Sequence, residues 1–250
     1  MLGQGHAGRD CDVTSGTTRL RRRESFVLIQ PPKIAVYISK LTVDVPGFVA
    51  TIGVHPRHIL SWNAPQKEAF KILVRSPNTK ALGEIGLDFT AKGIKKQEEV
   101  LKYLLRGFLN TAKPVILHLR GRKGHEDEAH NRGVNLAGAC LPREQPIQLD
   151  CFSGGADIAA RWQRQFPNLY MSFSGLVDSF NEHQKRGLQG EPANRLLLET
   201  DQTPNAYIKG RVNTPHRIGE VTTLVSQVRQ EPLSQVLETT NVNFRGLFHL

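Results

Sequence analysis

One carboxylate stands inside an apolar stretch of this sequence and needs a chemical partner. Residues 81–89 read ALGEIGLDF, with Glu84 placed between Gly83 and Gly86. An unpaired charge is very costly to bury, so Glu84 is expected to contact a metal ion, an arginine or a helix N-terminus. Glycine inside a strand indicates a place where a ligand or another backbone segment comes close.

The same pattern recurs three times further along the chain. Each case is a hydrophobic run with one metal-competent side chain near its carboxyl end: His118 in PVILHL, Asp150 in IQLDC and Asp201 in LLLETD. The steps from Glu84 to His118 and on to Asp150 fit one βαβ unit each, about 30 residues or more. Side chains at the carboxyl ends of the strands of a β/α barrel converge. We therefore expect these four side chains to form one site.

A set of short motifs extends this pattern over residues 48–250. In chain order they are GVHP, GEIGLDF, PVILHLR, CFSG, SFSG and LLLETD. Together they resemble the TatD family of metal-dependent deoxyribonucleases. The resemblance implies an α/β fold of the TIM-type (β/α)8 barrel class, a divalent metal cofactor (Mg²⁺ or Mn²⁺ before Zn²⁺) and hydrolysis of DNA, with 3′ exonuclease action as one form.

The resemblance also implies roles for the four strand-end residues. Glu84 would bridge two metals, and His118 and Asp150 would complete the second metal site. Asp201 would bind the first metal or activate water as a base, so Glu84 and Asp201 are the expected catalytic residues. A bound metal lowers the pKa of water and offsets the charge that develops on a phosphodiester.

Four further residues are candidates for substrate binding. His55 resembles the histidine near the substrate mouth, and its alternative is a core histidine bonded to backbone. Arg120 could hold a phosphate through two hydrogen bonds, and its alternative is a structural salt bridge. Ser153 and Gly154 precede a helix whose free N–H groups can bind phosphate, and their alternative is an ordinary turn between strand and helix.

Two departures from the family pattern bear on activity. No His-x-His pair, which supplies two ligands to the first metal in the family, occurs in the sequence. A true loss, an alternative first exon and an incomplete chain all explain this. Asp150 stands where the family has histidine, either as an oxygen ligand or paired to an arginine. We expect a weakened hydrolase. The alternative is an inactive barrel that binds nucleic acid or protein; an amidohydrolase-type enzyme is a third option.

Composition bears on partners and compartment. The formal net charge is +10, which favours polyanions through counterion release, so single-stranded or nicked DNA is the expected partner. The three cysteines, Cys11, Cys140 and Cys151, form no metal or disulfide pattern. No apolar run approaches the roughly 18 residues of a membrane helix. We expect a cytoplasmic or nuclear monomer without membrane contact.

Two parts of the chain differ in pattern. Residues 1–33 are expected to be a basic, disordered segment, although residues 26–29 and 34–38 are short apolar runs with strand character. Residues 34–250 are expected to form the barrel, with six strands from Phe48 onward and helices between them. His125 and His130 do not share a helix face, so residues 124–130 are interpreted as a solvated acidic loop.

Overall fold

The computed structural model describes residues 25–29, 48–107, 112–200 and 217–250 of the 250-residue chain. Asp201, one of the expected catalytic residues, lies outside these described residues. The arginine cluster at residues 19–23 and the apolar run at 34–38 lie outside them as well.

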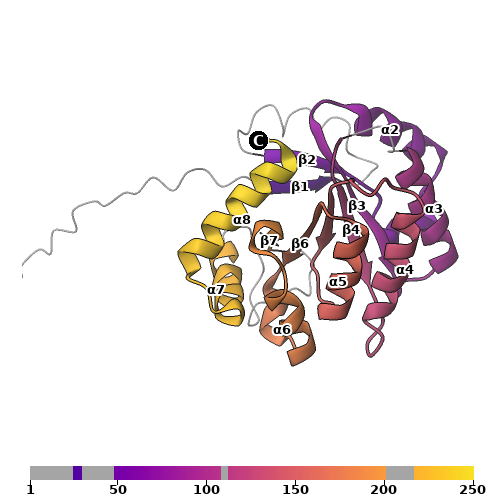
Figure 1. Ribbon diagram of the computed structural model, residues 1–250. Helices are drawn as coiled ribbons and strands as arrows, with labels where there is room; N and C mark the ends of the chain where they lie inside the picture. The colour runs from indigo at the N-terminus through magenta and orange to yellow at the C-terminus, as the bar shows by residue number, and fades with distance from the viewer. Residues whose placement is uncertain (1–24, 30–47, 108–111, 201–216) are drawn as a thin grey trace, which may run out of the picture.

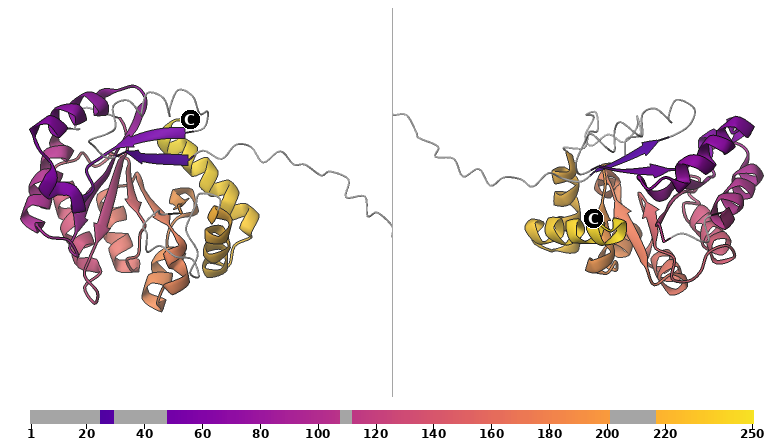
Figure 2. Two further views of the ribbon diagram at one scale, coloured as in Figure 1. Left: turned by 180° about the vertical axis from the view of Figure 1, so that it is seen from behind. Right: turned by 90° about the horizontal axis from the view of Figure 1, so that it is seen from above.

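One parallel sheet organises the molecule (Figure 1). Its strands are hydrogen-bonded in sequence order and comprise β1 (Ser25–Ile29), β2 (Phe48–Ile52), β3 (Thr79–Asp88), β4 (Val115–Arg120), β5 (Ile147–Asp150), β6 (Leu169–Phe173) and β7 (Leu196–Leu198). The expected α/β class with six strands from Phe48 onward is confirmed. Figure 2 shows the described strands curling into a half-barrel.

The first strand extends the sheet on its amino-terminal side. Strand β1 pairs in parallel with β2, from Ser25 opposite Phe48 to Ile29 opposite Ile52. It covers the apolar run 26–29, whose strand character the sequence indicated within the otherwise basic segment 1–33. The boundary expected at residue 34 remains a prediction.

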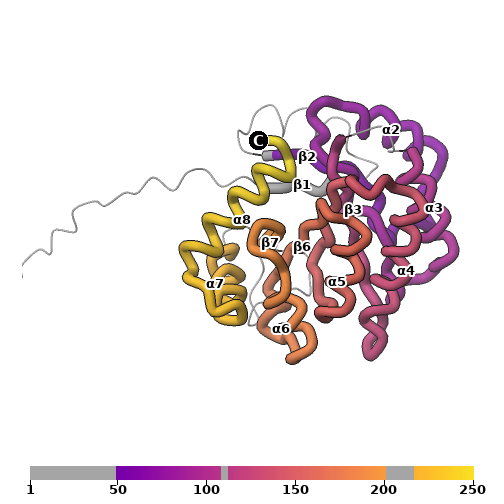
Figure 3. The backbone as a smooth tube through the Cα atoms, in the orientation of Figure 1, coloured from indigo at the N-terminus to yellow at the C-terminus, as the bar shows by residue number. Residues whose placement is uncertain are grey.

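Helices connect the strands and cover the outside of the curl (Figure 3). The α-helices are α2 (Ala64–Arg75), α3 (Ile94–Gly107), α4 (Asp127–Gly138), α5 (Ala156–Gln165), α6 (Glu182–Gln189), α7 (Ile218–Arg229) and α8 (Leu233–Phe248), and the 3-10 helices are η1 (Pro56–Ser61), η2 (Gly175–Ser179) and η3 (Ala193–Arg195). Asn63 caps α2, because its side chain accepts from the backbone N–H of Gln66.

The interpretation of residues 124–130 as a solvated loop is wrong for its second half. Helix α4 begins at Asp127, and its His130 is only 2% exposed. The His130 ring lies 5.1 Å from the ring of Phe152 in an edge-on contact. The polar residues Asp127 and Glu128 are the first turn of that helix, where acidic side chains favour the helix dipole.

Two apolar clusters hold the sheet. The larger cluster packs the outward-facing strand residues against the helices, as with Leu117 and Trp162. The smaller one lies at the amino ends of the strands and receives the last turns of α8; it comprises Val49, Ala81, Ile116, Tyr170, Leu197, Leu247 and Phe248. Side chains alternate along a strand, so His118 lies on the same face of β4 as Ile116, towards the carboxyl end.

Among the described residues, none of the helices combines the length and the apolar character that crossing a membrane requires.

Candidate functional site

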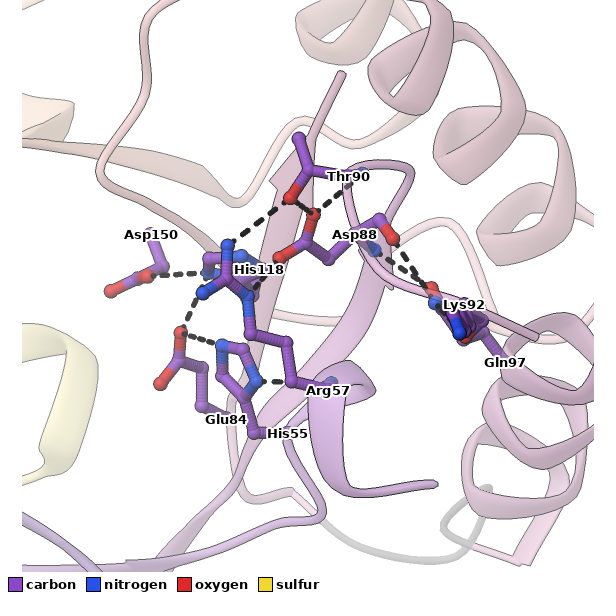
Figure 4. A network of polar contacts seen from close by, with 9 residues as sticks. All are labelled: His55, Arg57, Glu84, Asp88, Thr90, Lys92, Gln97, His118 and Asp150. Carbon is purple, nitrogen blue, oxygen red and sulfur yellow. Dashed lines mark hydrogen bonds and ion pairs between the residues drawn. The ribbon is translucent and has the colours of Figure 1, made fainter. Parts of the chain in front are cut away.

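Three of the expected side chains meet where the strands β3, β4 and β5 run side by side (Figure 4). The Oε1 atom of Glu84 lies 2.8 Å from Nδ1 of His118. The same nitrogen lies 3.5 Å from Oδ2 of Asp150. The structure thus brings together Glu84, His118 and Asp150, which the sequence had identified separately.

Strand register explains this meeting. His118 is opposite Gly86 on one side and Asp150 on the other. Gly86 has a φ of 151°, and a Cβ atom there would lie 1.9 Å from the backbone oxygen of His118. A Cβ at Gly83 would lie 2.4 Å from Cβ of Ile116. The two glycines therefore allow β3 and β4 to approach closely, which was one of the two roles expected for them.

The three groups perturb one another electrostatically. Burial raises the pKa of Glu84 to about 8, with the charge of Asp150 as the next cause. Burial disfavours the charged form of His118, but hydrogen bonds to Asp150 and Glu84 outweigh it and raise the pKa of His118 to about 10. Burial also opposes ionisation of Asp150, yet its contacts with His118 lower the pKa of Asp150. The cluster thus favours a positive charge between its two carboxylates.

His55 lies beside this cluster. Its Nδ1 accepts the backbone N–H of Arg57 at 3.2 Å, and its Nε2 lies 3.7 Å from Oε1 of Glu84. Burial, followed by the positive charge of His118, lowers the pKa of His55 to about 3. A neutral His55 whose Nδ1 accepts a hydrogen bond carries its proton on Nε2. It therefore points an N–H group at Glu84, and it has both the backbone bond and the site contact that the sequence treated as alternatives.

The donor atoms can be compared with the requirements of a divalent cation. Ligand atoms about 2.1 Å from one cation lie roughly 3.0–3.4 Å apart at octahedral or tetrahedral angles. The spacings from His118 to Glu84 and Asp150, 2.8 and 3.5 Å, are close to this. His55, Glu84 and His118 also offer ligand atoms within 4.8 Å of one another. Glu84 and His118 belong to both sets, so a cation at this site would be held by these two residues with Asp150 or His55 as the third ligand.

Glu199 is a residue of this region that the sequence analysis missed. It directly follows β7, and its Oε2 accepts a hydrogen bond from Ser172 Oγ at 2.5 Å. Ser172 in turn accepts from Gln148 at 3.1 Å. A hydrogen bond to Glu199 is also among the contacts of Asp150. The run LLLETD contained the signal, since Glu199 stands at the same strand end as Asp201.

Arg57 is a second missed residue, and Figure 4 shows its guanidinium bound to Asp88 and Thr90. It follows the GVHP motif in η1, and its Nε donates to Asp88 at 2.6 Å. The position of an arginine directly after the GVHP motif does not indicate where its side chain points. The contact with Asp88, 31 residues away, decides where it points.

The remaining expected substrate residues lie around the same end of the sheet. Arg120 is exposed at the end of β4 and makes no side-chain hydrogen bond or ion pair to any residue that the structure describes. The backbone oxygen of Ser153 accepts from Gln184 of α6 at 2.9 Å. A Cβ at Gly154 would lie 2.8 Å from the Phe152 ring. Packing thus accounts for the turn at 153–154, and its phosphate contact remains a prediction.

A separate group of metal-type side chains lies at the starts of α4, α5 and α6. His183 Nε2 is 3.4 Å from Asp157 and 4.0 Å from Asp127. The side chains of these residues are 47%, 70% and 39% exposed, respectively. Exposed ion pairs of this kind are common and weak, so this group serves below as a control for the buried cluster.

Comparison with known proteins gives the family. A protein of Edwardsiella piscicida named 3′-5′ ssDNA/RNA exonuclease TatD is 31% identical over 215 residues, covering 80% of this chain and 78% of the relative. A protein of Klebsiella pneumoniae (strain 342) with the same name is 30% identical over 216 residues, covering 81% and 77%.

Solved structures agree on the fold. The TatD homologue YjjV from Escherichia coli K12 superposes with a TM-score of 0.76 at 22% identity, covering 91% of this chain and 86% of that one. An uncharacterised amidohydrolase from Saccharomyces cerevisiae gives a TM-score of 0.68 at 16% identity, covering 90% and 88%. The model of the family described as TatD related DNase matches residues 21–249, so the chain belongs to the TatD related DNase family.

Proposed function

We propose that this chain is a metal-dependent phosphodiesterase that acts on single-stranded nucleic acid, with removal of nucleotides from a 3′ end as its mode of action. The observation that carries the proposal is the partly buried cluster of Glu84 within β3, His118 near the carboxyl end of β4 and Asp150 at the carboxyl end of β5. Relatives also support the proposal, because the Edwardsiella and Klebsiella proteins are named as 3′-5′ exonucleases of single-stranded DNA and RNA.

Each residue of the cluster has a role in this proposal. Glu84, His118 and Asp150 hold a divalent cation, Mg²⁺ or Mn²⁺ first because two of the three ligands are carboxylates. The cation supplies an activated water and offsets the charge on the phosphate when it is bound. Asp201, two residues after Glu199, is assigned as the base that accepts a proton from the attacking water or as a ligand to a second cation.

His55 acts on Glu84 and not on the substrate in this account. Its Nε2–H group faces the Glu84 carboxylate, and its pKa of about 3 keeps the ring neutral throughout the physiological pH range. A neutral N–H donor orients a carboxylate without contributing a charge. At 3.7 Å the contact is longer than a hydrogen bond, so His55 would orient Glu84 only once the two groups move closer together.

We propose further that turnover is slower than in a complete two-metal enzyme. The family's His-x-His pair is absent from the sequence. A first cation would have only Glu84 and Asp201, and two carboxylates bind a cation weakly compared with three ligands. One cation bound well and one bound poorly is therefore expected.

An assay on a 3′-terminated single strand tests the proposed function. A 5′-labelled DNA oligonucleotide incubated with Mn²⁺ should shorten one nucleotide at a time from its 3′ end. Glu84→Gln should reduce the rate by about 100-fold or more, because it removes a ligand and not merely a partner of one. The control Glu182→Gln changes an exposed carboxylate, 77% exposed and paired with Lys185, and should leave the rate unchanged.

The same assay separates the two hypotheses for the chain. Salt-sensitive binding of the oligonucleotide without any hydrolysis in Mg²⁺, Mn²⁺ or Zn²⁺ would contradict the enzyme and support a nucleic-acid-binding barrel. Hydrolysis that Glu84→Gln leaves intact would place the chemistry elsewhere in the molecule.

A further inference from the structure

The guanidinium of Arg57 is anchored to β3, the strand that carries Glu84. Arg57 lies two residues after His55, and its backbone N–H donates to that histidine at 3.2 Å. The Nε of Arg57 donates to Asp88 Oδ2 at 2.6 Å, and its Nη2 donates to Thr90 Oγ1 at 3.1 Å. Figure 4 shows these contacts of Arg57 in the same close-up as Glu84 and His118.

The residues that hold Arg57 are themselves fixed. The Asp88 side chain is 0% exposed, whereas that of Arg57 is 49% exposed. The second oxygen of Asp88 accepts from the backbone N–H and the hydroxyl of Thr90, at 2.9 and 2.5 Å. Gln97 bonds both the N–H and the carbonyl of Asp88, at 2.8 and 3.0 Å. A buried carboxylate thus positions a partly exposed cation, and little rotamer freedom remains for Arg57 to lose on binding.

The hydrogen-bond inventory of Arg57 leaves donors over. A guanidinium has five N–H groups, and Asp88 and Thr90 use one on Nε and one on Nη2. The two N–H groups of Nη1 and one of Nη2 make no hydrogen bond to any residue in the described ranges. These two nitrogens form the outer fork of the guanidinium, which matches two oxygens of a phosphate.

We propose that Arg57 binds two non-bridging oxygens of a backbone phosphate in the single strand, an inference that rests on the proposed function. Asp88 and Thr90 keep one edge of the guanidinium occupied, so the other edge is presented to the substrate beside Glu84 and His118. Arg57 is then a binding residue that acts through affinity for the strand. The expected phosphate is one adjacent to the bond that is cut or that bond's own phosphate.

Steady-state kinetics on the same 3′-terminated oligonucleotide tests this. Arg57→Lys keeps a charge beside Asp88 but lacks the fork, and Arg57→Gln removes the charge. We expect KM to rise about 10-fold or more in each, since hydrogen bonds to charged groups stabilise complexes to this extent, with kcat within about twofold. The slope of log KM against log salt should fall by about 0.7 in Arg57→Gln, the value for one phosphate contact with a single strand.

The matched control is Arg132→Gln. Arg132 pairs with both oxygens of Glu98 at 2.6 and 2.7 Å, an arginine–carboxylate pair on the outer surface between α3 and α4. It should change neither KM nor the salt slope. Replacing one phosphate at a time by a neutral methylphosphonate then locates the contact. When the contacted phosphate is replaced, the wild type should lose affinity for the oligonucleotide. Arg57→Gln already lacks the contact, so the same replacement should not lower its affinity further.

The outcomes separate the inference from the proposed function. Absence of both binding and hydrolysis by the unchanged chain would overturn the proposed function and this inference with it. Normal kinetics of the unchanged chain, with unaltered KM and salt slope in both Arg57 variants, would overturn the inference alone. A lower melting temperature of Arg57→Gln with unchanged KM would also overturn the inference, because the pair with Asp88 would then serve stability alone. Arg57→Lys keeps a charge beside Asp88, so its KM reports on the loss of the fork without the loss of that pair.

Discussion

The two ends of the curled sheet have opposite chemistry. At the amino ends of the strands, Ile116 and Tyr170 pack against Phe248 and its neighbours from α8. At the carboxyl ends, Glu84 and His118 face each other at 2.8 Å. Strand β4 alone shows the contrast, because Ile116 and His118 are two residues apart on one face.

The amino ends of the strands stabilise the fold, whereas the carboxyl ends carry the chemically active groups. Burial of apolar surface at the amino ends stabilises the fold by about 25 cal/mol per Å². Two carboxylates buried near each other, as Glu84 and Asp150 are, cost free energy until a positive charge lies between them. The sheet therefore tolerates the cluster at one end because the other end is held by side chains without charge.

The largest expected effect comes from the amino ends. Phe248→Ala removes a ring that is 1% exposed, and such truncations typically lower the free energy of unfolding by about 3–5 kcal/mol. Urea unfolding monitored by circular dichroism measures it. Val242→Ala on the same helix, at a residue 63% exposed, is the control and should change stability by no more than about 0.5 kcal/mol. A loss of unfolding free energy smaller than that of Val242→Ala would show that packing of α8 does not stabilise the amino ends of the strands.

The carboxyl ends should respond to pH instead. In the metal-free protein the pKa of Glu84 is raised from 4.5 to about 8 and that of His118 from 6.5 to about 10. Both groups hold a proton in the folded chain that they lose on unfolding, so stability should fall as pH rises from 6.5 to 8. The slope is at most about 1.4 kcal/mol per pH unit for each group.

Other groups of the site titrate outside this window. The pKa of His55 is lowered to about 3, so its contribution changes only below 6.5. Glu84→Gln should therefore reduce the slope by at least half, because it removes one titrating group and also a partner that raises the pKa of His118. Urea titrations at several pH values measure this slope. The control Glu182→Gln should leave the slope as it is. Stability that rises with pH over this range would show that the two carboxylates are not coupled to His118 as described.

The sequence predicted the cluster because hydrophobic runs end in polar residues only where something requires it. Glu84, His118 and Asp150 each interrupt or end an apolar strand, and parallel pairing then places them together. Arg57 and Glu199 escaped because their roles depend on contacts across the fold, to Asp88 and to Ser172 and Asp150.

The limits of local pattern also explain one open question and one error in the fold. Strand β1 is five residues long and is followed by prolines, so its place in the sheet rests on pairing with β2 and not on its own periodicity. The first turn of α4 is acidic, and from the sequence it was predicted to be a loop. His130, one turn later, is nevertheless buried. In both places tertiary contacts decide what a short segment does.

A titration with Mn²⁺ tests most directly whether the carboxyl ends form a metal site. Isothermal titration calorimetry of the full chain should show one tight site per chain and a second site that is much weaker. Asp150→Asn should weaken the tight site, since it removes one of three ligands, whereas Asp157→Asn in the exposed cluster should not. No saturable binding, two equally tight sites, or a tight site that Asp150→Asn leaves unchanged would contradict the account.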